Sequence, residues 1–264
     1  MYDFDYHRAT SVADAVAAKQ RDAETQYLAG GMSLIPVLKQ RLAAPSTLID
    51  LGDLELLRGI RLEGDRLVIG SLATHDAIAR SAGVRAAIPA LALMAAEIGD
   101  PQVRHRGTLG GAVANNDPAA DYPAAVVGLA ATIATDRRQI AADDFFRGLM
   151  QTALEADELI TEIAFPVPER AGYARFCQLA SRYPLVGVLA ARSPADVRVA
   201  VIGAGACVFR VPEFEDALAE DFTAAAIEGL TVSADGLNSD LHGSADYRAH
   251  LIGVLARRAV AAAS

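Results

Sequence analysis

Two glycine pairs stand in this chain at places where a backbone could come close to a phosphate group. The stretch AGGMS covers residues 29–33, and the stretch RGTLGG covers residues 106–111. Each pair has a hydroxyl residue near it, Ser33 in the first stretch and Thr108 in the second. Glycine lets the backbone turn tightly and lets a ligand approach its N–H groups. The two stretches therefore indicate either two unrelated turns or two halves of one anion-binding clamp.

The first stretch lies between a predicted strand and a predicted helix. The run TQYL at residues 25–28 is typical of a strand, and the residues after Ser33 favour a helix with Pro36 in its first turn. Such a junction aims several amides and a helix N-terminus at one point, which suits a phosphate. The stretch matches neither the GxGxxG fingerprint nor the Walker A motif. On its own it fits a structural turn at least as well.

The second stretch is followed by a polar cluster of Asn115, Asn116, Asp117 and Asp121. A diphosphate with a sugar-like chain needs N–H donors for its charge and acceptors for its hydroxyl groups, and Asp121 is a suitable acceptor. The alternative is that residues 115–118 form only a turn followed by a helix cap. The residues alone leave both interpretations open.

The composition argues against several other functions. The chain has 264 residues, a net charge of −9 and no run of about twenty apolar residues, so we expect neither nucleic-acid binding nor a membrane span. The N-terminus lacks the basic and apolar segments of a signal peptide, so a cytoplasmic protein is expected. Only Cys177 and Cys207 are present, too few to ligate an iron–sulfur cluster, and both are expected in the core. The five scattered histidines predict no metal site.

The pattern of elements predicts an α+β protein of three subdomains, near residues 1–52, 53–168 and 169–264. The expected helices lie at 10–21, after Ser33, across 75–99 with breaks at Gly83 and Pro89, and near 213–219 and 246–263. The expected strands lie at 25–28, 47–51, 185–191 and 196–205, with a hairpin at 58–74 that turns at Glu63-Gly64-Asp65. The run at 157–168 is predicted to be an edge strand, because it ends at Pro166 and Pro168.

Several stretches together resemble one known family over almost the whole chain. They are AGGMSLIPVLK at 29–39, IGSLATH at 69–75, IGDPQVRHRGTLGGAVANNDPAAD at 98–121, DELITEIAFPVP at 157–168 and QLASRYPLVGVLAA at 178–191. This sequence resembles the FAD-binding medium subunit of the molybdenum hydroxylases, the carbon monoxide dehydrogenase and xanthine dehydrogenase family. The paired AGGxSLxP and TxGG motifs, in this order and at this spacing, are specific to that family. The resemblance therefore favours the clamp over two separate turns.

The resemblance implies a fold and a cofactor. The expected fold is the vanillyl-alcohol-oxidase type (PCMH-type), with two α/β subdomains that bind FAD and a C-terminal α+β subdomain. FAD is expected to lie extended between the first two subdomains. The implied FAD-binding residues are Leu28, Ala29, Gly30, Gly31, Met32, Ser33, Leu34, Ile35, Ile98, Thr108, Gly110, Gly111, Asn115, Asp121, Ile160 and Gln178.

The matches also imply a role for each part of that set. The first stretch wraps the FAD diphosphate, and the second closes on its other side. By the same match, Ile98 lies near the adenosine or flavin portion, and Asp121 bonds ribityl or ribose hydroxyls with Asn115 assisting. The main chain of Ile160 is expected to approach the adenine side. Gln178 occupies a place where xanthine-oxidising members have lysine.

Some residues depart from the family pattern. Met32 stands where polar residues are usual, Ala112 where some members carry asparagine, and Gln178 where a lysine is found. These departures motivate an alternative in which the chain is a scaffold subunit with weak or lost FAD binding. A stand-alone flavin oxidoreductase is a further alternative, although no substrate base marks it.

Three other features allow two interpretations each. The basic run at 104–106 could face an acidic partner or the cofactor phosphates, or it could be a solvated loop with one ion pair. Tyr183 could stack near the flavin or pack within the third subdomain. His75 is expected to cap or pack a helix rather than to act in catalysis.

The resemblance further implies a role in electron transfer. The FAD of such a subunit passes electrons from the iron–sulfur clusters of a partner to an external acceptor. The implied partners are a small subunit with two [2Fe–2S] clusters and a large molybdopterin subunit, in a heterotrimer that forms a dimer of trimers. No catalytic side chain and no metal ligand of the chain's own is expected.

Overall fold

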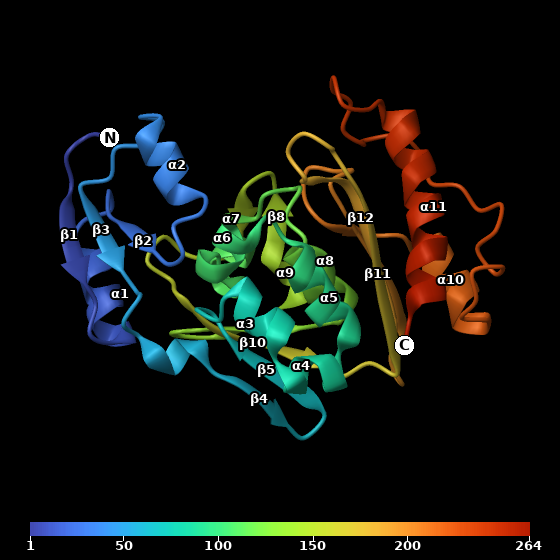
Figure 1. The fold of residues 1–264 in the computed structure, drawn as a ribbon, viewed down its shortest axis with the longest axis horizontal. Coiled ribbons are helices and arrows are strands. Elements are labelled where there is room, and N and C mark those ends of the chain that lie inside the picture. The colour runs from blue at the N-terminus through green and yellow to red at the C-terminus, as the bar shows by residue number, and fades with distance from the viewer.

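The computed structural model describes residues 1–264, which lie in three neighbouring parts along the long axis of the molecule. We call residues 1–52 the N-terminal segment, residues 53–168 the middle segment and residues 169–264 the C-terminal segment. Figure 1 shows them in chain order from the blue end to the red end, with the middle segment between the other two. The three largest sheets each take their strands from a single segment. The protein is therefore of the mixed α and β class that the sequence predicts.

The N-terminal segment holds a three-stranded parallel sheet with the order β1-β3-β2. Its elements are β1 (Asp5–Arg8), α1 (Val12–Arg21), β2 (Gln26–Leu28), α2 (Leu34–Lys39) and β3 (Thr47–Asp50). Helix α1 begins close to the predicted position because the Ser11 side chain accepts a hydrogen bond from the amide of Asp14. The sequence analysis missed β1, whose residues are mostly exposed and show no apolar alternation.

The middle segment is built on a five-stranded antiparallel sheet with the order β4-β5-β10-β6-β7. These strands are β4 (Ile60–Glu63), β5 (Arg66–Gly70), β6 (Thr132–Thr135), β7 (Gln139–Ala141) and β10 (Ile160–Pro166), and a separate ribbon pairs β8 (Phe146–Gly148) with β9 (Gln151–Thr152). The hairpin of β4 and β5 turns as predicted at Gly64, which has a φ of +60°.

Strand β10 is central, so the prediction of an edge strand was wrong. It pairs with β5 on one side and with β6 on the other. Pro166 stands at the last position of the pairing with β5, and the pairing with β6 ends earlier, at Ala164. The missing N–H of Pro166 therefore leaves the pairing with β6 intact.

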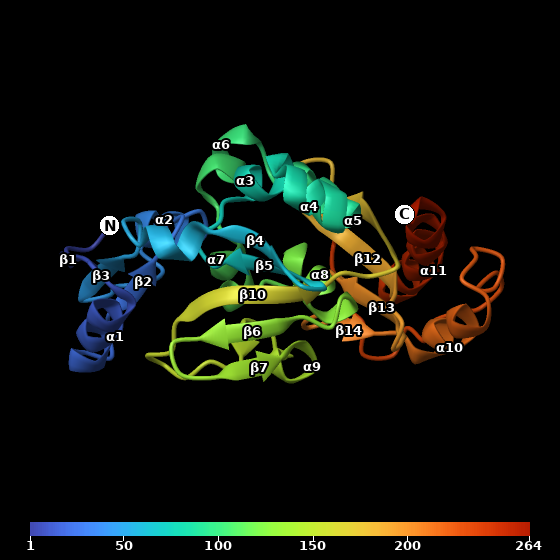
Figure 2. The same cartoon turned by 90° about the horizontal axis from the view of Figure 1, so that it is seen from below.

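The remaining elements of the middle segment are helices. They are η1 (Glu55–Arg58), α3 (His75–Arg80), α4 (Ala82–Ala87), α5 (Pro89–Glu97), α6 (Pro101–Arg106), α7 (Leu109–Asn115), α8 (Tyr122–Gly128) and α9 (Ala142–Phe145). Helix α5 begins at Pro89 as predicted, but the expected break at Gly83 lies at Ser81, whose side chain caps α4 by accepting from the amide of Val84. Figure 2 shows α3 to α6 grouped along one flank of the molecule.

The C-terminal segment has an antiparallel sheet with the order β11-β12-β13-β14. Its elements are β11 (Arg170–Cys177), β12 (Pro184–Arg192), β13 (Val197–Ile202), β14 (Phe209–Arg210), α10 (Pro212–Glu220) and α11 (Ala245–Ala262). Helix α11 lies against β11 and β12 (Figure 1). The two approach closely at Gly172, where a Cβ atom would collide with the carbonyl oxygen of Ala259.

Three hydrophobic clusters form the cores. The largest has 34 buried residues and joins the middle segment to the first strands of the C-terminal segment. The smallest has 8 buried residues, four from the N-terminal segment and four from the middle segment, the latter being Leu54, Leu57, Leu72 and Leu159. Cys177 and Cys207 are free and only half-buried, so the prediction that both lie in the core was wrong. None of the helices is both long enough and apolar enough to cross a bilayer.

Candidate functional site

A cavity of about 680 Å³ lies between the N-terminal and middle segments. We call it the large cavity. Both glycine stretches line it, together with the first residue of β10. The predicted site residues in its lining are Ala29, Gly30, Gly31, Met32, Ser33, Leu34, Thr108, Gly110, Gly111, Asn115 and Ile160. Residues that are far apart in the sequence thus face one space.

The two glycine stretches are in direct contact. A Cβ atom on Gly30 would collide with the carbonyl oxygen of Arg106 and would lie 3.0 Å from the Cα atom of Gly107. A Cβ atom on Gly111 would lie 3.8 Å from the Cβ atom of Ala29. Only a residue without a side chain fits at Gly30. The two stretches therefore form one structure and not two unrelated turns.

The first stretch presents free hydrogen-bond donors. The amides of residues 30–34 donate to no atom of the protein, whereas the next amide, of Ile35, donates to the carbonyl oxygen of Gly31 at 3.0 Å. The Ser33 side chain makes no capping hydrogen bond to α2. Gly31 has a φ of +74°, a conformation that favours glycine. A run of unpaired amides beside a free hydroxyl is suited to the oxygens of a phosphate.

The second stretch differs from the expected loop, because Gly110 and Gly111 lie in the first turn of helix α7. The amide of Gly110 donates to the carbonyl oxygen of Ser71 at 2.8 Å. The amide of Gly111 donates to the Oγ1 atom of Thr108 at 3.2 Å, which caps the helix. These amides already have partners, so this stretch offers a surface without side chains rather than free donors.

A second cavity, of about 490 Å³, continues from the first. We call it the small cavity. Residues that line both cavities are Met32, Ser33, His75, Ala112 and Asn115. The small cavity adds Ile98 and Asp121, two of the predicted site residues, and residues from the C-terminal segment such as Arg175 and Tyr183. The two cavities together form an elongated cleft.

Asp121 is a buried acidic residue in the lining of the small cavity. Its residue is only 5% exposed, and its Oδ1 atom accepts hydrogen bonds from the Tyr173 hydroxyl at 2.7 Å and from Nη1 of Arg175 at 3.0 Å. Burial raises the pKa of Asp121, while the neighbouring Arg175 guanidinium opposes that shift. The Nε atom of Arg175 lies 3.0 Å from Oε2 of Glu97. This network joins the middle and C-terminal segments.

Comparison with known proteins places the chain in a family. Residues 2–168 match the family described as the FAD binding domain in molybdopterin dehydrogenase. The nicotine 6-hydroxylase medium subunit of Paenarthrobacter nicotinovorans is 37% identical, over 97% of this chain and 95% of its own length. The carbon monoxide dehydrogenase medium chain of Afipia carboxidovorans is 38% identical with the same coverage of both chains. The chain belongs to this medium-subunit family.

Solved structures agree with that assignment. The carbon monoxide dehydrogenase of Hydrogenophaga pseudoflava matches with a TM-score of 0.88 and 34% identity, covering 98% of this chain and 96% of that chain. The fold is therefore the FAD-binding fold of the molybdenum hydroxylase medium subunits. FAD is the cofactor, and the chain is a subunit of an oxidoreductase. The elongated cleft, with free amides near its middle, fits such a dinucleotide.

His75 and Tyr122 are site residues that the sequence analysis missed or set aside. His75 is 4% exposed, lines both cavities and packs on the Tyr122 ring at 5.3 Å between centroids. Burial, with a smaller contribution from Arg104, lowers the pKa of His75 to about 4. The Nδ1 atom of His75 and the hydroxyl of Tyr122 are buried without a protein partner. The IGSLATH motif of the family carried the only sequence signal for His75.

Three of the predicted FAD-binding residues line neither cavity. Leu28 and Ile35 pack behind the first stretch, where both lie within 3.2 Å of the Cβ position of Gly31. Gln178 lies outside both linings, with its Nε2 atom 2.9 Å from Nδ1 of His242.

The structure also shows where the basic run at 104–106 and Tyr183 lie. Arg104 donates to the carbonyl oxygens of Ile98 and Gly99 at 3.0 and 3.1 Å, so it holds a turn beside the small cavity. The basic run is thus the end of helix α6, and the Arg104 side chain binds main-chain oxygens of its own chain. Tyr183 lines the small cavity but remains 59% exposed.

Proposed function

We propose that this chain is the electron-transfer subunit of a molybdenum hydroxylase, with FAD extended along the cleft formed by the large and small cavities. In this proposal the fold is of the vanillyl-alcohol-oxidase type, with subdomains at residues 1–52, 53–168 and 169–264. FAD supplies the redox chemistry: it accepts electrons from a reduced partner and passes them to an external acceptor. The contact between the two glycine stretches is the observation that carries the proposal.

The protein's own residues bind and orient the cofactor. The free amides of residues 30–34 and the Ser33 hydroxyl donate to the diphosphate oxygens. Asp121 accepts from hydroxyl groups of the ribityl or ribose chain, because its Oδ2 atom has no partner within the chain, while Arg175 and Tyr173 hold its Oδ1 atom. His75 stays neutral at pH 7, so it adds no charge to the cleft. Met32 supplies a main-chain donor but no polar side chain.

The proposed partners are a small subunit with two [2Fe–2S] clusters and a large molybdopterin subunit. The support is that the relatives are named as medium subunits or medium chains of nicotine 6-hydroxylase and carbon monoxide dehydrogenase. Both relatives align with this chain over nearly their full length. We therefore infer that this chain, like them, is the medium subunit of a complex with other subunits.

Purification of the tagged chain from its native host tests this proposal. We expect iron and molybdenum to purify with FAD in the ratio set by two [2Fe–2S] clusters and one molybdopterin. FAD without iron or molybdenum would favour a stand-alone flavoprotein. Iron and molybdenum without FAD would favour the scaffold alternative, in which Met32 and Ala112 mark the loss of cofactor contacts.

A further inference from the structure

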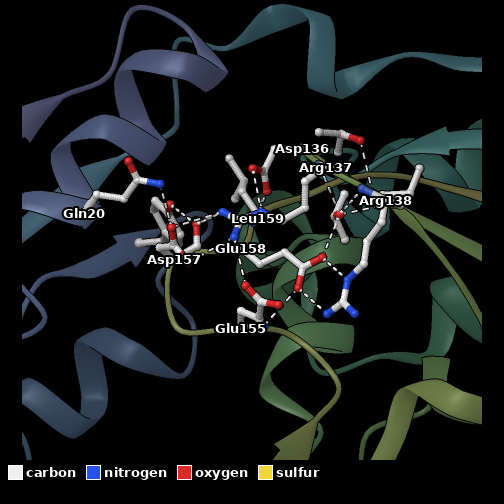
Figure 3. Close-up of polar contacts among 12 residues, drawn as sticks. Gln20, Asp136, Arg137, Arg138, Glu155, Asp157, Glu158 and Leu159 are labelled. Atoms are coloured by element: carbon white, nitrogen blue, oxygen red, sulfur yellow. Dashed lines mark hydrogen bonds and ion pairs between the residues drawn. The ribbon is translucent and has the colours of Figure 1, made fainter.

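Residues 155–159 form a short connection into β10 that crosses between two segments, and we call it the strap. Figure 3 shows its polar contacts, and in Figures 1 and 2 it reaches the N-terminal segment. We propose that the strap fixes the width of the FAD cleft and slows FAD release, with Asp157 as its positioning residue. This inference rests on the proposed function, because it requires FAD to occupy the large cavity.

Asp157 attaches the strap to the N-terminal segment. Its Oδ2 atom accepts a hydrogen bond from Nε2 of Gln20 on α1 at 2.7 Å. Its main-chain oxygen accepts from the hydroxyl of Tyr27 on β2 at 3.0 Å. Two different elements of the N-terminal segment therefore hold one residue of the middle segment. Figure 3 shows the contact with Gln20.

Glu158 attaches the strap to the middle segment on the opposite side. Its side chain is fully buried and binds Nε and Nη2 of Arg138 at 2.8 and 2.7 Å. It also accepts from the Thr135 hydroxyl at 2.8 Å and from the amide of Glu155 at 2.9 Å. Residues 155–158 form a turn, closed by a hydrogen bond from the amide of Glu158 to the carbonyl oxygen of Glu155 at 3.1 Å. Within this turn the side chains of Asp157 and Glu158 bind different segments.

Leu159 returns to the side of the N-terminal segment. It is 6% exposed and belongs to the small hydrophobic cluster that also contains Ala15 and Ile49. Its main chain is tied to Asp136 by two hydrogen bonds, of 2.8 and 3.0 Å. The strap thus contributes both a polar and an apolar contact across the boundary between the two segments.

Arg137 braces the strap from the middle segment. Its guanidinium lies 3.1 Å from Oδ2 of Asp157, 3.0 Å from Oε2 of Glu155 and 3.2 Å from Oδ2 of Asp136. Asp157 is consequently shared between Arg137 and the two side chains of the N-terminal segment. Loss of Gln20 or Tyr27 as a partner would remove one of the polar contacts between Asp157 and the N-terminal segment.

The strap also forms part of the wall of the FAD cleft. Its residues Glu155, Ala156, Glu158 and Leu159 line the large cavity, and Tyr27 lines the same cavity from the other segment. The contact of Gly30 with Arg106 joins the segments at another point of this wall. The Tyr27–Asp157 and Gly30–Arg106 contacts together hold the two walls at a fixed separation. A ligand between the walls leaves fastest when one of the contacts opens.

The test measures FAD release from four variants of the full chain loaded with FAD. Tyr27→Phe removes one hydroxyl, Gln20→Ala removes the amide donor, Asp157→Ala removes the carboxylate, and Asp157→Asn keeps an acceptor oxygen. Glu162→Gln is the matched control, because Glu162 lies on β10 just after the strap and its side chain pairs with Arg61 of β4 at 2.9 Å, not with the N-terminal segment. The rise of free-flavin fluorescence after dilution gives the dissociation rate.

We expect Tyr27→Phe and Gln20→Ala each to release FAD about fivefold faster, since each removes one hydrogen bond. Asp157→Ala should release it about tenfold faster, and Asp157→Asn should lie between Asp157→Ala and the wild type. The control should match the wild type. Equal release rates for the wild type, Tyr27→Phe and Asp157→Ala would overturn the inference.

Failure of the underlying proposal has a different signature. If Gly30→Ala and Ser33→Ala retained FAD as tightly as the wild type, the cofactor would not occupy this cleft. In that case the strap inference would fall together with the proposed site. If these two variants lost FAD while the strap variants behaved as the wild type, only the strap inference would be wrong.

Discussion

His75 shows how one buried side chain can link the site to pH. Its pKa of about 4 in the folded chain lies below the usual 6.5 because burial disfavours the charged ring. The unfolded chain takes up a proton near pH 6.5, whereas the folded chain does not until about pH 4. The stability that this group contributes is therefore present above pH 6.5 and is lost as the pH falls towards 4.

The wild type should lose about 2 kcal/mol of unfolding free energy from this group between pH 7 and pH 5. His75→Gln has no ring to protonate, so its stability should fall less over the same interval. Urea denaturation at the two pH values measures both proteins. Parallel losses in the wild type and in His75→Gln would show that His75 is not held neutral by burial.

Asp121 and Arg175 form a buried ion pair that can be tested by removing one partner or both. Arg175→Met leaves the Asp121 carboxylate buried without its cation, and we expect a loss of about 3 kcal/mol of unfolding free energy. The double variant Asp121→Asn/Arg175→Met removes the unpaired charge and should recover part of that loss. Chemical denaturation of the single and double variants gives the coupling energy. Additive effects would contradict the ion pair as the structure has it.

At the scale of elements, Asn116 holds the ribbon of β8 and β9 beside helix α7. It ends α7 with a φ of +44°, and its Nδ2 atom donates to the carbonyl oxygens of Gly148 at 2.9 Å and Gln151 at 2.7 Å. The residue is fully buried. The left-handed conformation and the two hydrogen bonds both favour asparagine over alanine.

Asn116→Ala should cost about 2 kcal/mol of unfolding free energy, because it loses two hydrogen bonds and strains the backbone. Asn116→Gly loses the hydrogen bonds but adopts the same φ without strain, so its cost should be smaller. Urea denaturation ranks the two variants, and hydrogen exchange of the amides near residues 148–152 reports on the ribbon. A larger loss for glycine than for alanine would contradict this account of Asn116.

The sequence predicted those elements whose signals are local. The position of α1, the turn at Gly64 and the start of α5 at Pro89 all depend on nearby residues, and all three were predicted. The central position of β10 was missed, because the partners that cover both its edges come from residues 66–70 and 132–135. The sequence of β10 itself carries no signal of this pairing.

In the candidate site, too, local features could be predicted from the sequence and long-range contacts could not. The glycine pairs and Ser33 were recognisable from residue type and spacing, and family resemblance was needed to join them. That Gly110 and Gly111 form a helical turn depends on the Thr108 cap and on Ser71, which is distant in the sequence. The strap was not foreseen either, because its contacts join residues 20 and 27 to residue 157.

At the scale of the whole molecule, the cleft exists because three segments meet around it. The N-terminal segment provides the free amides, the middle segment provides α7 and the strap, and the C-terminal segment lines the small cavity with Arg175 and Tyr183. No segment alone contains all of these groups. FAD binding should therefore depend on how the segments are held together as well as on direct contacts.

The central claim is that FAD lies with its diphosphate between the two glycine stretches. The most direct test is the absorption spectrum near 370 and 450 nm of the full chain after incubation with FAD and gel filtration, in the wild type and two variants. Gly30→Ala must push the first stretch away from Arg106, whereas Ser33→Ala removes a hydroxyl that makes no hydrogen bond to the α2 amides and should leave the fold unchanged.

We predict that the wild type keeps the flavin bands, that Gly30→Ala loses them, and that Ser33→Ala binds FAD about fivefold more weakly at unchanged thermal stability. Retention of FAD by both variants at the wild-type level would contradict the claim, and so would a wild-type chain that binds no FAD.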